Sequence, residues 1–339
     1  MIRIAVDAMG GDHGPSVIVD GAVAAARQGD VRVALVGAST DLERALTRHQ
    51  GWSALPIEIV EACEVIAMAE SPAAALRRKP GASIRVAADR VASGQADALV
   101  SAGHTGATVM AAHAAFGMLG GVDRPALAAA IPTQKHPAVL LDAGANAECR
   151  PQHLLQFAVM GSVYARVAWG FERPKVGLLS IGEEATKGNE LTREAHRLLK
   201  SAPVNFIGNI EGREIYSGAA DVVVCDGFTG NVVLKMSEGL VETVETLLAN
   251  ELQGAWSSRV GYLLSRRAFA RFRSRLDYSE YGGAALLGVA GLAIVGHGCS
   301  SAKAVGNAVK MAARFAAAEF TARISQEIGA AATAGEDRL

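Results

Sequence analysis

The sequence has few aromatic residues and no excess of either charge, and both shortages restrict the class of protein. Phe, Trp and Tyr make up 5% of the 339 residues, whereas glycine occurs 37 times. This combination does not suit an all-β sandwich and favours an α/β protein packed by Ala, Val and Leu. Lys and Arg (33) nearly balance Asp and Glu (34), so the overall charge gives no reason to expect a nucleic-acid partner.

Cysteine is scarce as well. Cys63, Cys149, Cys225 and Cys299 lie far apart and show no C-x-x-C spacing, and the histidines show no metal-ligand spacing. We therefore expect reduced, mostly buried thiols in a cytoplasmic protein, and no metal site.

Several familiar signatures are also missing. No G-x-G-x-x-G follows a strand with an acid about 20 residues further on, which weakens a dinucleotide interpretation, and neither G-K-[ST] nor G-x-S-x-G occurs. We expect no cofactor. The most apolar stretch, 282–298, is rich in glycine and falls short of the roughly 20 residues that a spanning helix needs. Asp7 interrupts the only apolar run near the N-terminus, so we expect no signal peptide.

One pattern recurs along the chain: a short apolar run, a turn of Gly, Ser, Thr or Asn, and then an amphipathic or Ala-rich helix. This alternation predicts a mostly parallel sheet covered by helices on both faces, a three-layer α/β/α sandwich. We expect one domain over 1–325, a flexible tail over 326–339, and a protruding basic helical segment over about 240–276. The strands are predicted at 2–8, 31–37, 57–62, 97–103, 138–144, 175–182, 204–210 and 221–227.

Four strand-to-helix turns carry polar groups in addition to glycine: "VDAMGGDHGP" (6–15), "SAGHTGA" (101–107), "SIGEEATKGNEL" (180–191) and "CDGFTGNVVLK" (225–235). In a parallel sheet such turns present free N–H groups and a partial positive charge, which suit phosphate. Ordinary turn and capping roles explain any one of them, but four together favour a shared anion site. The candidate phosphate or substrate ligands are Gly10, Gly11, His13, Ser101, Gly103, Thr105, Gly188, Asn189, Thr229 and Gly230. Asp7 and Asp12 would repel an anion, so we expect them to shape the turns.

Read in order, these turns resemble the bacterial phosphate acyltransferase family, PlsX. The resemblance also includes "LDAGANAE" (141–148), "FIGNIEGREI" (206–215), "DYSEYGGAALLG" (277–288) and "HGCSSAKAVGNA" (297–308). It implies a homodimer with a fold related to isocitrate dehydrogenase and phosphotransacetylase. The implied reaction moves a fatty acyl group from acyl carrier protein to inorganic phosphate, and the acyl phosphate feeds a membrane acyltransferase.

The resemblance implies that Lys187 and Asn231 are catalytic. Three positions depart from the family pattern: His104 and Ser180 stand where Asn is usual, and Ala285 stands where Pro is common. Because phosphate is itself the nucleophile, the reaction needs a group that holds this anion and hydrogen-bond donors for the oxyanion. The leaving thiolate needs little assistance from an acid. Lys187 suits the first task and Asn231 the second. His104 is a candidate donor to the leaving thiolate.

The stretch 256–276 holds six arginines and no acid, with apolar residues at roughly helical spacing. It suits acyl carrier protein or an anionic membrane surface, although a solvated helix face explains it equally well. The candidate contact residues are Arg259, Leu263, Leu264, Arg266, Arg267, Phe269 and Arg271. We expect peripheral membrane contact at most.

Two alternatives remain open at this stage. The first is an NAD(P)-dependent dehydrogenase of related fold, although the sequence offers no cluster of metal-binding aspartates. The second is a non-catalytic regulator that binds acyl carrier protein or membrane, in which Lys187 would be dispensable.

Overall fold

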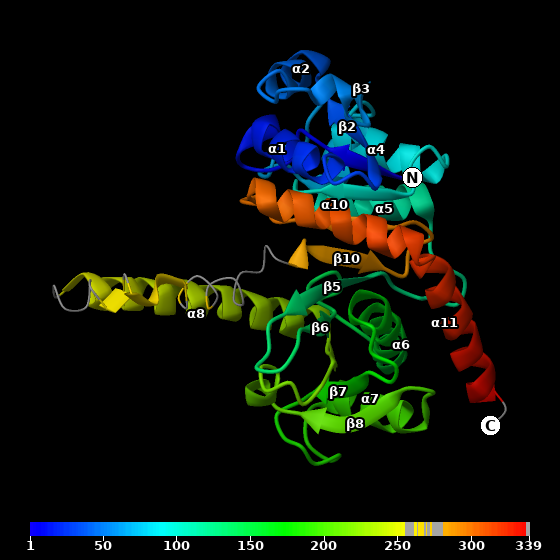
Figure 1. The fold of residues 1–339 in the computed structure, drawn as a ribbon. Coiled ribbons are helices and arrows are strands. Elements are labelled where there is room, and N and C mark those ends of the chain that lie inside the picture. Colours follow the sequence, from blue (N-terminus) through cyan, green and yellow to red (C-terminus); the bar gives the residue numbers. More distant parts are fainter. Residues whose placement is uncertain (255–260, 263, 268, 270–271, 273–280, 337–339) are drawn as a thin grey trace.

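The computed structural model describes residues 1–254, 261, 262, 264–267, 269, 272 and 281–336. Strands and helices alternate along most of this chain (Figure 1). The strands are β1 Ile2–Asp7, β2 Val31–Gly37, β3 Ile57–Glu61, β4 Ala98–Ser101, β5 Ala126–Ile131, β6 Ala138–Leu141, β7 Lys175–Leu179, β8 Asn205–Ile210, β9 Val222–Val224, β10 Ala284–Leu287 and β11 Ala293–Val295. The helices are α1 Gly14–Ala26, α2 Ser39–Leu46, α3 Pro72–Arg78, α4 Ser83–Ala92, α5 Thr105–Phe116, α6 Pro151–Trp169, α7 Glu190–Ser201, α8 Gly227–Gly254, α10 Ala302–Ala317 and α11 Phe320–Glu336, with short 3-10 turns η1 Trp52–Ala54 and η2 Gly212–Glu214.

All the described strands join one sheet in the order β3-β2-β1-β4-β11-β10-β5-β6-β9-β7-β8. The pairings within β3-β2-β1-β4-β11 are parallel, and so are those within β6-β9-β7-β8. The three pairings between these blocks, β11 with β10, β10 with β5 and β5 with β6, are antiparallel. The two parallel blocks therefore run in opposite directions. The expected mostly parallel sheet is confirmed, and its antiparallel centre is an addition to the prediction.

Helices cover both faces of the sheet, as the three-layer prediction requires. On one face α1, α2 and α10 pack together, as do α6, α7 and α11, over the largest apolar cluster. On the other face α3, α4 and α5 cover a second cluster, whose Ala-rich positions let these helices lie close to the strands. The first turns of α8 complete this second face, because Leu234 packs on it. The rest of α8 projects away from the body (Figure 1).

Two expectations differ from the structure. Helix α11 continues to Glu336, so residues 326–336 are helical and not a flexible tail; Ile324 and Ile328 are buried against the core and fix this helix. The thiols are not mostly buried, because Cys63 and Cys299 are exposed in loops that follow strands.

The two parallel blocks share a local pattern. Residues 96–106 (ADALVSAGHTG) and 220–230 (ADVVVCDGFTG) have the same Ala-Asp, Val, Gly and Thr-Gly positions, at β4 and β9. Each aspartate accepts a hydrogen bond of 2.7 Å from the backbone N–H of a residue at the start of the adjacent strand: Asp97 from Arg3, and Asp221 from Lys175. The turn before α5 is thus the structural counterpart of the turn before α8.

Candidate functional site

The first two predicted turns lie side by side with the loop after β11. Asp7 at the end of β1 is in register with Ser101 at the end of β4, which is in register with Val295 of β11. The backbone N–H of Asp12 donates to the carbonyl of Gly298 at 2.8 Å. The sheet therefore gathers Gly10, Gly11, His13, Ser101, Gly103, His104 and Thr105 at one edge.

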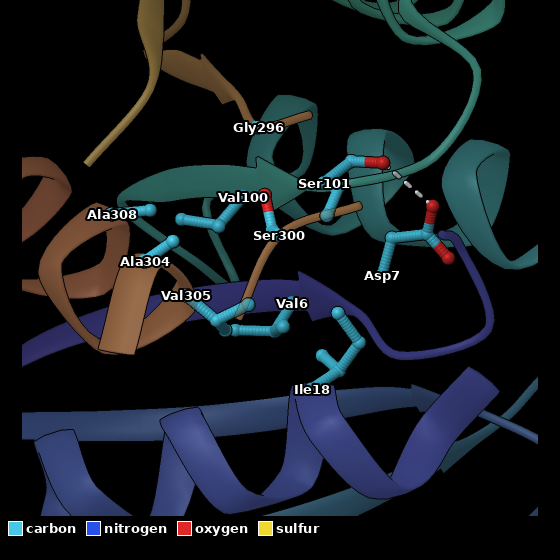
Figure 2. A pocket seen from close by; sticks show the side chains of 11 residues that line it. Val6, Asp7, Ile18, Val100, Ser101, Gly296, Ser300, Ala304, Val305 and Ala308 are labelled. Carbon is cyan, nitrogen blue, oxygen red and sulfur yellow. Dashed lines mark hydrogen bonds between the residues drawn. The ribbon is translucent and has the colours of Figure 1, made fainter. Parts of the chain in front are cut away.

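Asp7 and Ser101 tie the two turns together. The Ser101 hydroxyl donates to Asp7 Oδ2 at 2.7 Å and accepts the N–H of Gly103 at 3.1 Å (Figure 2). Both side chains are buried, and burial raises the pKa of the Asp7 carboxyl. The cavity beside them, which Figure 2 shows lined by Val6, Ile18 and other apolar side chains, has about 10 Å³. That is room for about one water molecule and too little for a phosphate or acyl group.

Gly10 and Gly103 are in direct backbone contact. A Cβ at Gly10 would lie 2.7 Å from the Cα of Gly103, so no side chain fits between the turns. Gly11 has a φ of 95°, in the left-handed region that favours glycine. These glycines let two backbones approach closely, which is the arrangement that a backbone anion site needs.

His104 caps α5. Its Nδ1 accepts the backbone N–H of Gly106 at 3.1 Å, so in the neutral ring Nε2 carries the hydrogen. Thr105 follows as the exposed first residue of the helix. His13 precedes α1, is exposed, and makes no capping hydrogen bond through its side chain.

The predicted turn at 225–231 opens α8. Asp226 caps the helix: its carboxylate accepts the N–H of Thr229 at 2.8 Å and the Thr229 hydroxyl at 2.7 Å. Asn231 is exposed on the first turns of the helix, where the N-terminal end of a helix carries partial positive charge. The Thr229 hydroxyl therefore serves the cap, whereas the Asn231 amide faces solvent.

Sequence reasoning missed how strongly Asp142 shapes this turn. Asp142 is fully buried and its carboxylate accepts five N–H groups, from the backbones of Leu127, Gly144, Ala145 and Asn146 and from the Asn146 amide. The resulting loop packs on α8: Gly144 lies beside the Asn231 side chain, and Gly230 lies against the Asp142 carbonyl. The sequence "LDAGANAE" contains a signal for this role. An aspartate followed by small residues and Asn often accepts hydrogen bonds from the backbone N–H groups of the turn that it starts.

Lys187 lies in the turn after β7. It is exposed, and its N–H donates to the Glu184 carbonyl at 3.0 Å. Gly188 has a φ of 94°, and a Cβ there would come within 2.0 Å of Thr192 Oγ1. Asn189 caps α7, accepting the Thr192 N–H at 2.9 Å. The hydroxyl oxygen of Ser180, at the base of this turn, is buried and has no hydrogen-bond partner among the described residues.

The turns of Lys187 and Asn231 leave neighbouring strands. Leu178 of β7 is in register with Val224 of β9, and Leu141 of β6 pairs with the same valine. The ends of β6, β7 and β9 therefore adjoin at one edge. Among the described residues no hydrogen bond joins Lys187 to Asn231. A link to the other block runs through α8, where Glu238 Oε1 lies 3.0 Å from His297 Nε2 in the loop after β11.

Part of the predicted basic contact surface lies within the described residues. Leu264, Arg266 and Arg267 are helical and exposed, and Phe269 is half-buried with its ring 5.2 Å from that of Tyr262. Arg259, Leu263 and Arg271 lie outside the described residues. In the part of the chain that the structure describes, no helix is long and apolar enough to cross a membrane. Over that same part, no group of three or more His, Cys, Asp or Glu side chains is placed to hold a metal ion.

Comparison with known proteins identifies relatives over nearly the whole chain. A family model described as fatty acid synthesis protein matches residues 2–323. A phosphate acyltransferase of Geobacter sp. (strain M21) is 50% identical over 327 residues, covering 96% of this chain and 93% of the relative. Phosphate acyltransferases of Nitratidesulfovibrio vulgaris (strain DP4; 51%, 96% and 94% covered) and Heliobacterium modesticaldum (50%, 96% and 98% covered) are equally similar.

Solved structures with the same fold are more distant in sequence. A phosphotransacetylase from Streptococcus pyogenes superposes with a TM-score of 0.62 at 18% identity, covering 94% of each chain. A 4-hydroxythreonine-4-phosphate dehydrogenase from Klebsiella pneumoniae gives 0.51 at 12% identity, covering 93% of this chain and 99% of the other. The predicted kinship of fold with phosphotransacetylases and dehydrogenases is thereby confirmed.

Proposed function

The chain belongs to the phosphate acyltransferase family, and from that premise we propose that it transfers a fatty acyl group from acyl carrier protein to inorganic phosphate. The family assigns acyl transfer to phosphate. The acyl donor, the mechanism and the residues that carry it are our proposal.

One observation carries the proposal. The turn with Lys187 and the helix start with Asn231 follow adjacent, in-register strands, and both groups are exposed at that edge. A cation, a neutral amide and the N-terminal end of a helix at neighbouring strand ends are the groups that an anion site uses. Ser180 supports this placement, since its buried hydroxyl lacks a partner at the base of the Lys187 turn.

Lys187 holds the phosphate and aims it at the thioester. An ammonium on a flexible stem suits an anion that must enter and leave as part of a product. Backbone N–H groups of the glycine turns, Gly188 among them, complete the cradle. Placing the phosphate oxygen next to the carbonyl carbon removes the entropic cost of a bimolecular encounter, worth up to roughly 7–11 kcal/mol.

The reaction then needs one bond to form and one to break. A phosphate oxygen bonds to the carbonyl carbon, and the C–S bond breaks to give acyl phosphate and the carrier's thiolate, which takes up the proton that phosphate loses. The Asn231 amide donates to the developing oxyanion without protonating phosphate. The Nε2–H of His104 is available to donate a hydrogen bond to the sulfur, because Nδ1 is occupied by the helix cap.

Partners follow from the same proposal. The acyl phosphate would be consumed by a membrane acyltransferase, and we propose that the basic segment 256–276 contacts both acyl carrier protein and the membrane surface. The family resemblance favours a homodimer. The exposed Met236, Leu240 and Leu247 of α8 support it, because side chains of this kind are normally covered in an assembly.

The decisive experiment incubates the protein with acyl carrier protein thioester and phosphate, and traps acyl phosphate with hydroxylamine. We expect phosphate-dependent product, and Lys187→Ala and Asn231→Ala are each expected to lower the rate at least about 100-fold, the usual cost of an anion or oxyanion contact. Acyl coenzyme A in place of the carrier thioester determines the donor preference.

Lys200→Ala, at the exposed end of the helix that follows Lys187, is the matched control and is expected to keep wild-type activity. Circular dichroism must show that all variants fold. Unchanged activity in Lys187→Ala would refute the mechanism and favour a non-catalytic binding protein. A change in nicotinamide absorbance after the protein is mixed with the nicotinamide cofactor and a hydroxy acid would instead favour a dehydrogenase.

A further inference from the structure

One face of α8 carries three polar side chains that the proposed mechanism uses only in part. Asn231, Lys235 and Glu238 follow at i, i+4 and i+7, so they lie on the same face of the helix. The exposed apolar residues Met236 and Leu240 fall on the opposite side by the same spacing. The face of α8 that bears Asn231, the proposed oxyanion donor, therefore remains polar for the next two helical turns.

This face looks toward the turns of the other parallel block. Glu238 Oε1 lies 3.0 Å from Nε2 of His297, in the loop after β11. The next residue of that loop, Gly298, accepts the N–H of Asp12 at 2.8 Å, and a Cβ on Gly298 would lie 3.0 Å from the Asp12 carboxylate. Glu238 thus fixes α8 against the loop that contacts the turn after β1.

Glu238 also holds Lys235. Its second oxygen, Oε2, accepts from Lys235 Nζ at 2.9 Å, while Glu238 itself is largely buried and Lys235 is 54% exposed. An ammonium has three donors, and Glu238 takes one of them. Because Glu238 stands at i+3, this bond draws the ammonium toward the C-terminal end of α8, and its remaining donors are open to a ligand along the face of the helix that bears Asn231.

We propose that Lys235 is a second cationic contact for the phosphate nucleophile, held over the Asn231 face of α8 by Glu238, which His297 anchors. The inference rests on the proposed function and adds a residue to its site.

The charge on the nucleophile supports this assignment. Inorganic phosphate carries between one and two negative charges near neutral pH, in the ground state as well as during the reaction. A single ammonium, Lys187, leaves that charge partly uncompensated. Glu238 is shared between two partners, so it positions Lys235 while leaving it able to bind an anion.

The test replaces Lys235 by Gln in the full chain and measures acyl phosphate formation at saturating acyl carrier protein thioester. A contact made equally in the ground and transition states changes KM alone. We expect the phosphate KM to rise about tenfold with kcat within about twofold, and Lys235→Arg, which keeps the charge, to stay within about threefold of wild type. Lys310→Gln, at an exposed lysine of α10, is the control and should change neither.

A second measurement needs no acyl donor. Phosphate that binds the native state raises the unfolding temperature, and Lys235→Gln is expected to need about ten times more phosphate for the same rise. An unchanged phosphate KM and an unchanged phosphate-induced shift would overturn the inference. So would a rise in the KM for the carrier thioester alone, since Lys235 would then dock the carrier. Wild type that binds phosphate but makes no acyl phosphate would refute the proposed function, and the phosphate titration would still decide the role of Lys235.

Discussion

At the scale of single residues, the glycine turns use many of their polar groups on themselves. The Ser101 hydroxyl donates to Asp7, the Thr229 hydroxyl donates to Asp226, and Asn189 caps its own helix. The predicted ligands left to meet an anion are the exposed ones that these bonds do not use, which include Lys187 and Asn231 as well as His13 and Thr105. Sequence alone could not separate these groups, because the residue types that cap a helix also bind phosphate.

Asp7 gives a pH prediction at this scale. Burial raises the pKa of its carboxyl above the value of the unfolded chain, so the native state binds this proton more tightly. The stabilising effect is fully present below the unfolded pKa, about 4, and is lost as the pH rises through the folded pKa. We expect Asp7→Asn, which keeps an acceptor for Ser101, to gain stability relative to wild type as the pH rises above about 4.

Urea unfolding of both proteins across pH measures this difference, whose slope is at most about 1.4 kcal/mol per pH unit for one proton. Asp41→Asn, at an exposed ion pair with Arg44, is the control and should vary by less than about 0.5 kcal/mol. A difference between Asp7→Asn and wild type that falls as the pH rises would contradict the proposed burial of the carboxyl.

At the scale of elements, the position of α8 depends on two close approaches to the loop after β6. A Cβ on Gly230 would lie 1.9 Å from the Asp142 carbonyl oxygen, and Gly227 is similarly confined by the loop at Asn146. Asn231 stands on the same turn of the helix. The site is therefore built by the fit of α8 onto the loop that Asp142 organises.

Two glycines of this helix provide a matched pair of variants. Gly230→Ala is expected to lower the free energy of unfolding by about 1–3 kcal/mol, because the backbone must move to admit the methyl group. Gly239→Ala, where no atom of the described residues lies within 4 Å of the added carbon, is expected to raise it by about 0.5–1 kcal/mol through helix propensity. Denaturant titrations compare them. Equal effects would show that the contact with Asp142 does not hold the helix.

The eight strands expected from the sequence are all present, but three others were missed. β10 and β11 are short and lie in a glycine-rich stretch, and β5 reads ALAAAI; alanine shows neither β propensity nor a clear period. Their pairing is set by tertiary contacts in the middle of the sheet. The direction of the second parallel block depends on these three strands, so its reversal could not be predicted from local patterns.

At the scale of the whole molecule, the proposed site lies at the root of a projecting helix, and Glu238 of that helix contacts His297 of the other parallel block (Figure 1). The repeated Ala-Asp and Gly-x-Thr-Gly positions of β4 and β9 were visible in the sequence and could have shown that the blocks correspond. The pattern could not show how the counterparts have diverged. Asn231 stands where the first block has Ala107, so the proposed catalytic amide belongs to one block only.

The basic segment 256–276 lies in sequence directly beyond α8, and this order underlies the last prediction. A carrier protein whose thioester reaches Asn231 at the base of α8 has its body outside these turns, where a cationic surface would attract its acidic side chains. We expect Arg266→Glu combined with Arg267→Glu to raise the KM for the carrier thioester about tenfold and leave the phosphate KM unchanged.

The variant should keep the molar mass of wild type by light scattering, twice 35.0 kDa if the proposed dimer forms. Arg44→Glu, at an exposed arginine of α2, reverses a charge elsewhere as the control. If the carrier KM stays constant while sedimentation with anionic vesicles is lost, the segment binds membrane and not the carrier. If the carrier KM and the vesicle sedimentation both stay constant, the arginines only form the solvent-exposed face of a helix.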